Sequence, residues 1–220
     1  MAQQLRLRLQ RSAPFTREAF VAGPSNADAL AALDSWPNWP GGCLVLVGAP
    51  GVGKSHLAQA WAATARATWL LREAPDLEAA TAGPALVEDV DQGAPAEALF
   101  HLINLAARDG GGLLMTARTR PASWPSPLPD LRSRLNALFV AEIGPPDDIV
   151  LEGVLRRFFR ERSIRPAPEV YSYMLRRMPR SIPKAEELVR RMDEAADGAI
   201  SRLLARSILE ADTQNLDLFE

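Results

Sequence analysis

The sequence predicts an α/β fold, with a parallel sheet sandwiched by helices and a small all-helical subdomain after it. Short apolar runs alternate with helical patterns over residues 43–143, which is typical of parallel strands joined by helices. A glycine-rich motif at residues 48–55 lies between the first of these runs and a helical pattern, which is the setting of a phosphate-binding loop. After the Pro145–Pro146 break, the remaining patterns are helical.

Composition excludes several classes of protein. The chain of 220 residues carries 25 basic and 27 acidic side chains, a net charge of −2, and 47% of its residues are hydrophobic. Disordered chains have fewer apolar residues, and proteins that coat nucleic acid or membranes by bulk charge are more basic. One cysteine, Cys43, and two histidines, His56 and His101, exclude a disulfide framework and a metal site built from several cysteines.

Nothing in the sequence indicates a membrane partner. No apolar run approaches the roughly 18 residues that a membrane-spanning helix needs. The first ten residues, MAQQLRLRLQ, place arginines between leucines and lack the continuous apolar stretch of a signal peptide. We therefore expect a soluble, cytoplasmic protein.

Four buried strands are predicted, because each is a short apolar run bounded by chain breakers or polar residues. They lie at residues 43–47, 84–90, 113–116 and 138–143. Helices are expected at about residues 26–36, 54–67 and 95–106. In the third helix one face collects the apolar side chains, namely Leu99, Leu102, Ile103 and Ala106.

The second half of the chain is expected to be a helical lid. Helical patterns cover residues 152–163, 169–178 and 182–209, and residues 150–210 carry 13 basic and 9 acidic side chains. The expected organisation is therefore a tail at 1–12, the α/β domain at 13–145, the lid at 146–210 and a polar tail at 211–220.

The strongest motif is the full match of residues 48–55 to the phosphate-binding loop G-x-x-x-x-G-K-[ST]. Its glycines let backbone N–H groups turn toward phosphates, and the next helix presents its positive N-terminus. The predicted nucleotide-binding residues are therefore Gly48, Ala49, Pro50, Gly51, Val52, Gly53, Lys54 and Ser55. Lys54 would reach the β- and γ-phosphates and Ser55 would bind Mg²⁺. The alternative, a chance glycine-rich turn, is expected in on the order of 1% of chains of this size.

Two acids end the second predicted strand. Glu88 is predicted to hold Mg²⁺ and Asp89 to act on the attacking water as the catalytic base. The more common order places aspartate first, so fast hydrolysis is less well supported than binding. Alternatively, these acids simply end a strand.

A basic segment, LRSRL at residues 131–135, has two interpretations. It is either a solvated face of a helix or an arginine finger that reaches the γ-phosphate of a neighbouring molecule.

These motifs and their spacing resemble the DnaA-type AAA+ ATPases and, within them, the regulatory inactivators of replication initiation. FVAGPSN at 20–26, GKSHLAQA at 53–60, TARTRP at 116–121 and PDLRSRL at 129–135 carry the resemblance, which covers residues 13 to about 208. It implies that Phe20 and Val21 lie against adenine, that His56 belongs to the nucleotide site, and that the cofactors are ADP or ATP with Mg²⁺. It also implies that Arg134 is the finger and Arg132 a neighbour.

The sequence departs from the family pattern at two positions. Arg118 stands near the place of an acidic sensor, and Pro183 stands where the lid arginine is expected. Arg180 is the first candidate to replace that arginine, with Lys184 as the second and a solvated helix start as the alternative.

The N-terminal tail predicts a partner. The segment QLRLRL resembles the hexapeptide with which these inactivators dock on the DNA polymerase III sliding clamp (its β subunit), which implies contacts from Gln4, Leu5, Leu7 and Leu9. An ordinary edge strand is the alternative. A second candidate peptide lies near the C-terminus and contains Gln214, Leu216, Leu218 and Phe219.

The leading hypothesis is a regulator that docks on the clamp and stimulates hydrolysis of ATP bound to DnaA, reaching DNA only through the clamp. A homodimer is one oligomeric state compatible with this hypothesis. An autonomous DnaA-like or helicase-loader ATPase is the second hypothesis. A small-molecule phosphotransferase fits poorly, because the arginine-finger segment would have no purpose in it.

Overall fold

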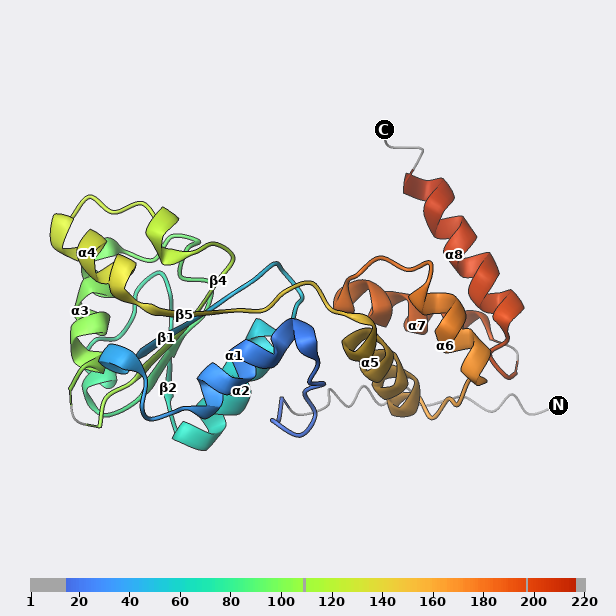
Figure 1. Ribbon diagram of the computed structural model, residues 1–220, viewed down its shortest axis with the longest axis horizontal. Coiled ribbons are helices and arrows are strands. Elements are labelled where there is room, and N and C mark those ends of the chain that lie inside the picture. The colour runs from blue at the N-terminus through green and yellow to red at the C-terminus, as the bar shows by residue number, and fades with distance from the viewer. Residues whose placement is uncertain (1–14, 109, 197, 217–220) are drawn as a thin grey trace.

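A five-stranded parallel sheet forms the centre of the N-terminal part of the protein (Figure 1). The computed structural model describes residues 15–108, 110–196 and 198–216. The strand order is β2-β3-β4-β1-β5, and every paired strand runs parallel to its neighbour. The strands are β1 (Cys43–Val47), β2 (Thr68–Leu70), β3 (Ala85–Val87), β4 (Leu113–Ala117) and β5 (Phe139–Glu142).

Four of these strands confirm the sequence prediction, and the fifth, β2, was missed. Its three residues, Thr68–Leu70, are too few to show a periodic pattern. It lies at the edge of the sheet and pairs only with β3, so tertiary pairing rather than a buried apolar run defines it.

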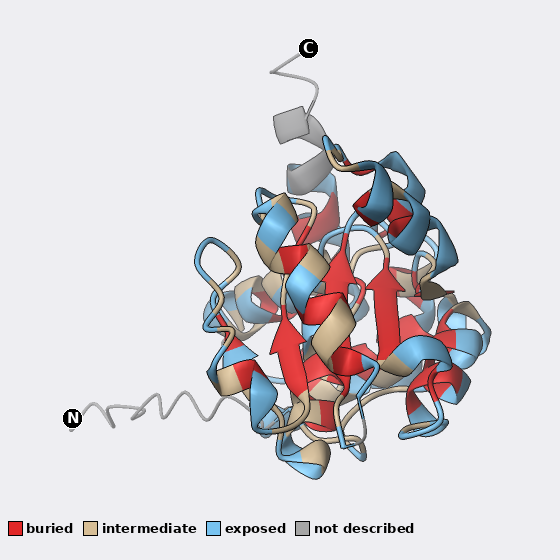
Figure 2. Ribbon diagram, turned by 90° about the vertical axis from the view of Figure 1, so that its left-hand side faces the viewer, coloured by how far each residue is buried: buried red, intermediate tan, exposed pale blue. Residues whose placement is uncertain are grey.

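Alternate side chains of β1 enter two separate cores, because successive residues of a strand point to opposite faces. Val45 packs in the core that α3 (Ala96–Ala106) and α4 (Pro129–Ala137) share. Leu44 and Leu46 pack in the core built by α1 (Ala27–Asp34) and α2 (Lys54–Ala65). The central strands β1, β3 and β4 are therefore buried between two helical layers (Figure 2), which confirms the predicted sandwich.

The predicted apolar face of α3 is also confirmed, since Leu99, Leu102, Ile103 and Ala106 are buried. Short 3-10 helices mark four connections in this part of the chain: η1 (Pro24–Asn26), η2 (Pro40–Gly42), η3 (Ala79–Thr81) and η4 (Pro121–Ser123).

Residues after β5 form a helical lid with a core of its own. Its helices are α5 (Asp148–Glu161), α6 (Pro168–Leu175), α7 (Ile182–Ala195) and α8 (Arg202–Leu216). In Figure 1 the lid lies beside the sheet part, joined to it by the segment after β5.

Two details of the lid differ from the prediction. The helix expected over 182–209 is divided between α7 and α8, and the connection contains Gly198, which disfavours a helix interior. Helix α8 continues to Leu216, so the start of the expected polar tail at 211–220 is helical. Residues 202–216 contain neither glycine nor proline to stop the helix.

Among the described residues, no helix is both long enough and apolar enough to span a membrane.

Candidate nucleotide-binding site

The glycine-rich loop joins the end of β1 to the start of α2, at the C-terminal ends of the parallel strands. Gly51 and Gly53 have φ angles of +77° and +109°, a left-handed region that other residues rarely adopt. A Cβ at Gly48 would lie 2.6 Å from the carbonyl oxygen of Ile143. The backbone conformation therefore requires glycine at these motif positions.

Lys54 points into the loop that precedes it. Its side chain is buried, and Nζ donates hydrogen bonds to the carbonyl oxygens of Gly48 at 2.7 Å and Ala49 at 3.0 Å. Burial lowers the pKa of Lys54, while the nearby Asp89 carboxylate opposes that shift. The loop thus holds a poorly solvated cation, which is suited to binding an anion.

The lid covers the same loop. A Cβ at Gly51 would lie only 2.4 Å from Cγ of Pro183 in the first turn of α7. Pro183 therefore stands in van der Waals contact with the loop, at the position where the resemblance implies an arginine.

Neither replacement candidate for that arginine lines the cleft beside the loop. Arg180 forms an exposed ion pair with Asp148 at the start of α5. Lys184 donates a hydrogen bond to Glu187 at 3.0 Å. Both cations therefore form contacts within the lid. Their closeness to Pro183 in the sequence did not predict that their side chains point away from the cleft.

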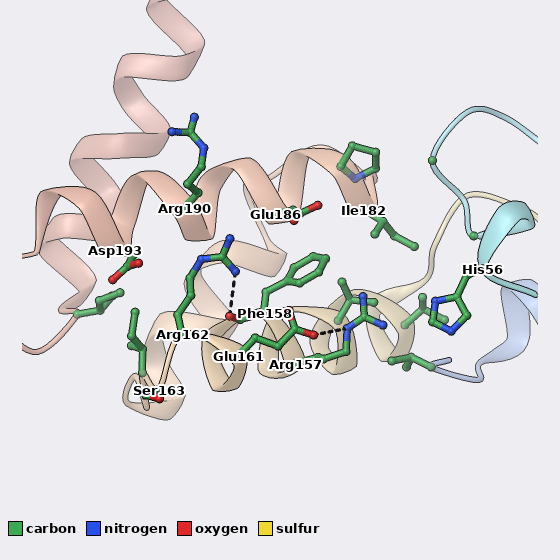
Figure 3. Close-up of a pocket in the computed structure, with 18 of the residues that line it drawn as sticks. His56, Arg157, Phe158, Glu161, Arg162, Ser163, Ile182, Glu186, Arg190 and Asp193 are labelled. Atoms are coloured by element: carbon green, nitrogen blue, oxygen red, sulfur yellow. Dashed lines mark hydrogen bonds and ion pairs between the residues drawn. The ribbon is translucent and has the colours of Figure 1, made fainter. Parts of the chain in front are cut away.

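The loop and the lid enclose a cleft of about 1440 Å³. The wall on the side of the sheet part includes Phe20, Val21, Lys54, Ser55 and His56. The lid part of the lining comes mainly from α5 and α7, and Figure 3 shows side chains of these two helices directed into the space between them. This part of the lining includes four arginines together with four acids: Arg157, Arg162, Arg165, Arg190, Glu161, Glu186, Asp193 and Glu194.

Aromatic packing holds the segment before α1 against the loop. The Phe20 ring lies 2.9 Å from the point where a Cβ on Gly53 would be, and it meets the His56 ring edge-on, as does Phe15, with both centroid distances at 5.3 Å. His56 Nε2 donates a hydrogen bond to the Thr16 carbonyl oxygen at 2.8 Å. Burial lowers the pKa of His56, and the hydrogen bond to Thr16 opposes part of this shift.

Asn26 fixes the loop that carries Phe20 and Val21. It is 2% exposed; its Nδ2 donates to the Val21 carbonyl oxygen, and its Oδ1 accepts from the Gly23 amide, both at 3.0 Å. A buried amide with both ends paired defines one loop conformation. Asn26 is the last residue of the FVAGPSN motif, but this structural role was not predicted from the motif.

Asp147 ties the same loop to the lid, and sequence reasoning missed it. Its carboxylate accepts hydrogen bonds from the amide of Ser25 at 2.8 Å and from the amide of Val150 at 3.0 Å, so it also caps α5. Partial burial alone would raise the pKa of Asp147, but these hydrogen bonds outweigh it and lower the pKa. The signal was available: an aspartate after Pro145–Pro146 and before a helical pattern predicts a helix cap.

The two predicted acids, Glu88 and Asp89, follow β3 directly, at the same C-terminal end of the sheet as the glycine-rich loop. Asp89 has a φ of +51°, and its amide donates to Thr116 Oγ1 at 2.9 Å. Within the described residues, Glu88 Oε1 is buried and has no hydrogen-bond partner. A buried carboxylate oxygen without a donor is suited to a cation.

Asp91 is a third acid at the C-terminal end of the sheet, and it was not predicted as a site residue. Its Oδ2 accepts hydrogen bonds at 2.9 Å from the amides of Arg118 and Thr119 and from the Thr119 hydroxyl. Burial would raise the pKa of Asp91, but these donors lower it. Asp91 thereby fixes the turn after β4, and Arg118 stands close enough to Lys54 for its charge to contribute to lowering that lysine's pKa.

The residues at the C-terminal end of the sheet provide oxygen atoms suited to coordinating Mg²⁺. The described part of the chain contains no group of three or more His, Cys, Asp or Glu side chains that could hold a metal. Mg²⁺ beside phosphates needs only one or two protein oxygens, since phosphate and water supply the rest. The Ser55 hydroxyl and the unpartnered oxygen of Glu88 provide that set.

The two arginines of α4 do not line the cleft. Arg134 is exposed and stacks over the Phe100 ring at 5.0 Å, whereas Arg132 donates to the Ala122 carbonyl oxygen at 2.9 Å. Arg134 therefore lies outside the cleft of its own chain, on the exposed surface of α4.

The predicted clamp-binding residues Gln4, Leu5, Leu7 and Leu9 lie outside the described residues, as do Leu218 and Phe219. Gln214 and Leu216 lie in the last turns of α8.

No protein-family model matches the sequence, and no curated protein matches it significantly. Solved structures do resemble it. Domain III of the Thermotoga maritima replication initiation protein DnaA has a TM-score of 0.72 at 18% identity, over 90% of this chain and 96% of that one.

AMPPCP-bound DnaA from Aquifex aeolicus has a TM-score of 0.69 at 18% identity, over 83% of this chain and 65% of that one. The chain thus spans less than two thirds of that longer protein. The RuvB Holliday junction branch migration motor of Thermotoga maritima has a TM-score of 0.66 at 18% identity, over 90% of this chain and 72% of that one. The chain therefore has the P-loop AAA+ fold of these DnaA and RuvB structures, a parallel sheet sandwiched by helices and followed by a small all-helical lid.

Proposed function

We propose that the cleft between the glycine-rich loop and the lid binds ADP or ATP with Mg²⁺. The observation that carries this proposal is the buried Lys54 ammonium inside a loop that only glycines can form. Phe20 and Val21 offer an apolar wall for the base on the same side of the cleft. Two of the DnaA structures with this fold contain AMPPCP, which supports the same kind of ligand.

Each part of the site has a defined task in this proposal. The backbone amides of the loop and Lys54 bind the phosphates, and Ser55 and Glu88 would hold Mg²⁺, which would supply charge neutralisation between the phosphates. Asp89 would accept a proton from the attacking water. Arg118 would face the γ-phosphate as a second cation, in place of the acidic sensor that the family resemblance implies.

We propose further that the chain is a regulator of replication initiation that acts on a partner, in the manner of the inactivator Hda. The exposed Arg134, which stands away from its own cleft, supports a role at a neighbour's nucleotide. In that role its guanidinium stabilises negative charge on the γ-phosphate of ATP bound to DnaA, while water attacks phosphorus and the bond to the β–γ bridging oxygen breaks, releasing phosphate and leaving ADP.

The N-terminal residues Gln4, Leu5, Leu7 and Leu9 would hold the chain on the sliding clamp of DNA polymerase III. Clamp docking would bring Arg134 to DnaA on DNA, so that the chain limits repeated initiation.

An autonomous ATPase, DnaA-like or a helicase loader, is the second candidate function. The unpartnered Glu88 oxygen and the closeness of Asp89 to Lys54 favour it, since they suit hydrolysis in the chain's own cleft.

Turnover of ATP separates the two functions. We expect little phosphate release by the chain alone and strong stimulation of DnaA by the chain on DNA-loaded clamp. Arg134→Ala should remove the stimulation, because an arginine finger contributes roughly a thousandfold or more to the rate. Arg132→Ala, which changes the same helix and the same charge, is the matched control. Fast turnover by the chain alone, unaffected by DnaA and clamp, would establish the second function instead.

A further inference from the structure

A second hollow lies on the lid, separate from the nucleotide cleft. It has a volume of about 480 Å³ and shares no lining residue with the cleft. Helices α6 and α8 and the turn after α6 supply its lining: Tyr173, Arg177, Arg202, Leu203, Arg206 and Glu210.

Two of its three arginines stack on one aromatic ring. The guanidinium carbons of Arg177 and Arg202 lie 4.3 Å and 5.3 Å from the centroid of the Tyr173 ring. In the part of the chain that the structure describes, neither arginine forms an ion pair with a carboxylate. The third, Arg206, pairs with Glu210 at 2.6 Å. Among the described residues, the hollow therefore holds two arginines without an ion pair, while Glu210, the acid in its lining, is paired with Arg206.

Stacking prepares these side chains for an anion. A guanidinium held by its face on a ring keeps its N–H groups at the edge, where they are available to an acceptor, and loses less side-chain entropy on binding. Leu203, at the mouth of the hollow, is 77% exposed. Arg202 and Arg206 are one helical turn apart on α8, so the cations follow the helix axis and Arg177 faces them from the neighbouring element.

We propose that this hollow binds the phosphate backbone of DNA. Within the described chain, Arg177 and Arg202 present two guanidiniums without an ion pair in one hollow, and arginine forks suit the phosphate oxygens that repeat along a DNA backbone. Besides the three arginines, the lining consists of Tyr173, which the arginines cover, Glu210, which pairs with Arg206, and the apolar Leu203. This set has no arrangement for reading bases, so the binding is independent of sequence. An acidic protein segment is the competing occupant.

The size of the effect follows from the number of contacts. With two or three phosphate contacts, binding should be weak, in the range of about 10⁻⁴ to 10⁻⁶ M that non-specific contacts give. Each contact contributes about 0.9 to the slope of the logarithm of affinity against the logarithm of salt concentration. Loss of Arg177 and Arg202 should therefore make that slope shallower by about 1.8.

The test is fluorescence anisotropy of the full chain with a labelled DNA duplex over a series of salt concentrations, with no clamp or DnaA present. R177A/R202A should lose roughly tenfold or more in affinity and show the shallower slope. R17A/R120A is the matched control: it removes two arginines that are paired on the sheet part, with Asp34 and Glu142, and should bind as wild type does.

A second variant tests the same hollow in case R177A/R202A does not fold. Leu203→Asp adds a carboxylate at the mouth of the hollow, leaves the stacked arginines in place and suits the first turn of a helix. It should weaken binding, while Leu71→Asp, at a position 73% exposed in the sheet part, should not.

Three results would overturn the proposal: no binding of DNA by the wild type, equal losses in the control variants, or binding of polyglutamate with the same sensitivity to these variants in place of DNA. The inference does not depend on the proposed nucleotide or clamp functions, because the assay contains neither component.

Discussion

Gly51→Ala tests the contact between the glycine-rich loop and the lid. The substitution adds one methyl group at a backbone φ of +77°. That methyl carbon would lie 2.4 Å from Cγ and 2.6 Å from Cδ of Pro183, whereas ordinary contact begins at 3.4 Å. The lid would have to move away from the loop by about 1 Å to accommodate it.

Two separate costs add at this position. A residue other than glycine in the left-handed region costs about 1–2 kcal/mol. Overpacking against the proline ring costs about 1–3 kcal/mol more. Gly41, with a φ of +62° and nothing within 4 Å of its added Cβ, pays only the first cost and is the matched control. We therefore expect Gly51→Ala to lower the free energy of unfolding by about 1–3 kcal/mol more than Gly41→Ala does.

Removing the ring should remove the second cost. Cβ of Pro183 lies 3.8 Å from the added carbon, an ordinary contact, so Gly51→Ala/Pro183→Ala retains no steric clash. Urea unfolding of both single variants and the double variant gives the coupling energy, and calorimetry with ADP shows whether the cleft closes normally. Equal losses at Gly51 and Gly41, or strictly additive single variants, would refute the contact between Pro183 and the loop.

Three further predictions concern the nucleotide, the tail and pH. Lys54→Met, which keeps an apolar stem in the buried position, should weaken ADP binding at least about tenfold by calorimetry, because a charge-assisted contact of about 1.5–3 kcal/mol is lost; unchanged affinity would contradict the proposed site. Replacing Gln4, Leu5, Leu7 and Leu9 with alanine should abolish clamp binding in surface plasmon resonance without lowering the melting temperature, whereas a lower melting temperature would indicate that the segment packs on the domain. His56→Gln should flatten the loss of stability on acidification: the His56 pKa is lowered in the folded state, so the unfolded chain binds more protons and stability falls as pH drops through about 6.5 and below. Parallel melting curves of wild type and variant from pH 7 to pH 5 would contradict this.

Local chemistry determined most of the fold. The runs at 43–47 and 113–116 became central strands, because a sheet covered on both faces needs continuous apolar residues. Proline, glycine and polar residues around them predicted where strands end and helices begin. Much of the phosphate-binding loop was local too, since backbone angles require glycine at positions 51 and 53. At Gly48 the requirement comes instead from the distant Ile143, whose carbonyl oxygen would lie 2.6 Å from an added Cβ.

Tertiary structure decided the rest of the candidate site. From its position in the sequence, Arg180 was the first candidate for the lid cation at the phosphates. The direction of its side chain depends on how α5 and α7 pack, and in the folded chain it pairs with Asp148. The strand β2 exists only through its pairing with β3. Asp91, bound to the turn after β4, and Asp147, bound to Ser25, gained their roles from partners that are distant in the sequence.

The same division applies to charge. From the sequence alone, the directions of the 13 basic side chains over residues 150–210 could not be predicted. The folded lid separates arginines that pair with acids from Arg177 and Arg202, which stack on Tyr173. Backbone angles and apolar periodicity act over a few residues and can be recognised in the sequence. The direction of a long side chain depends on contacts between distant elements, and only the folded chain determines them.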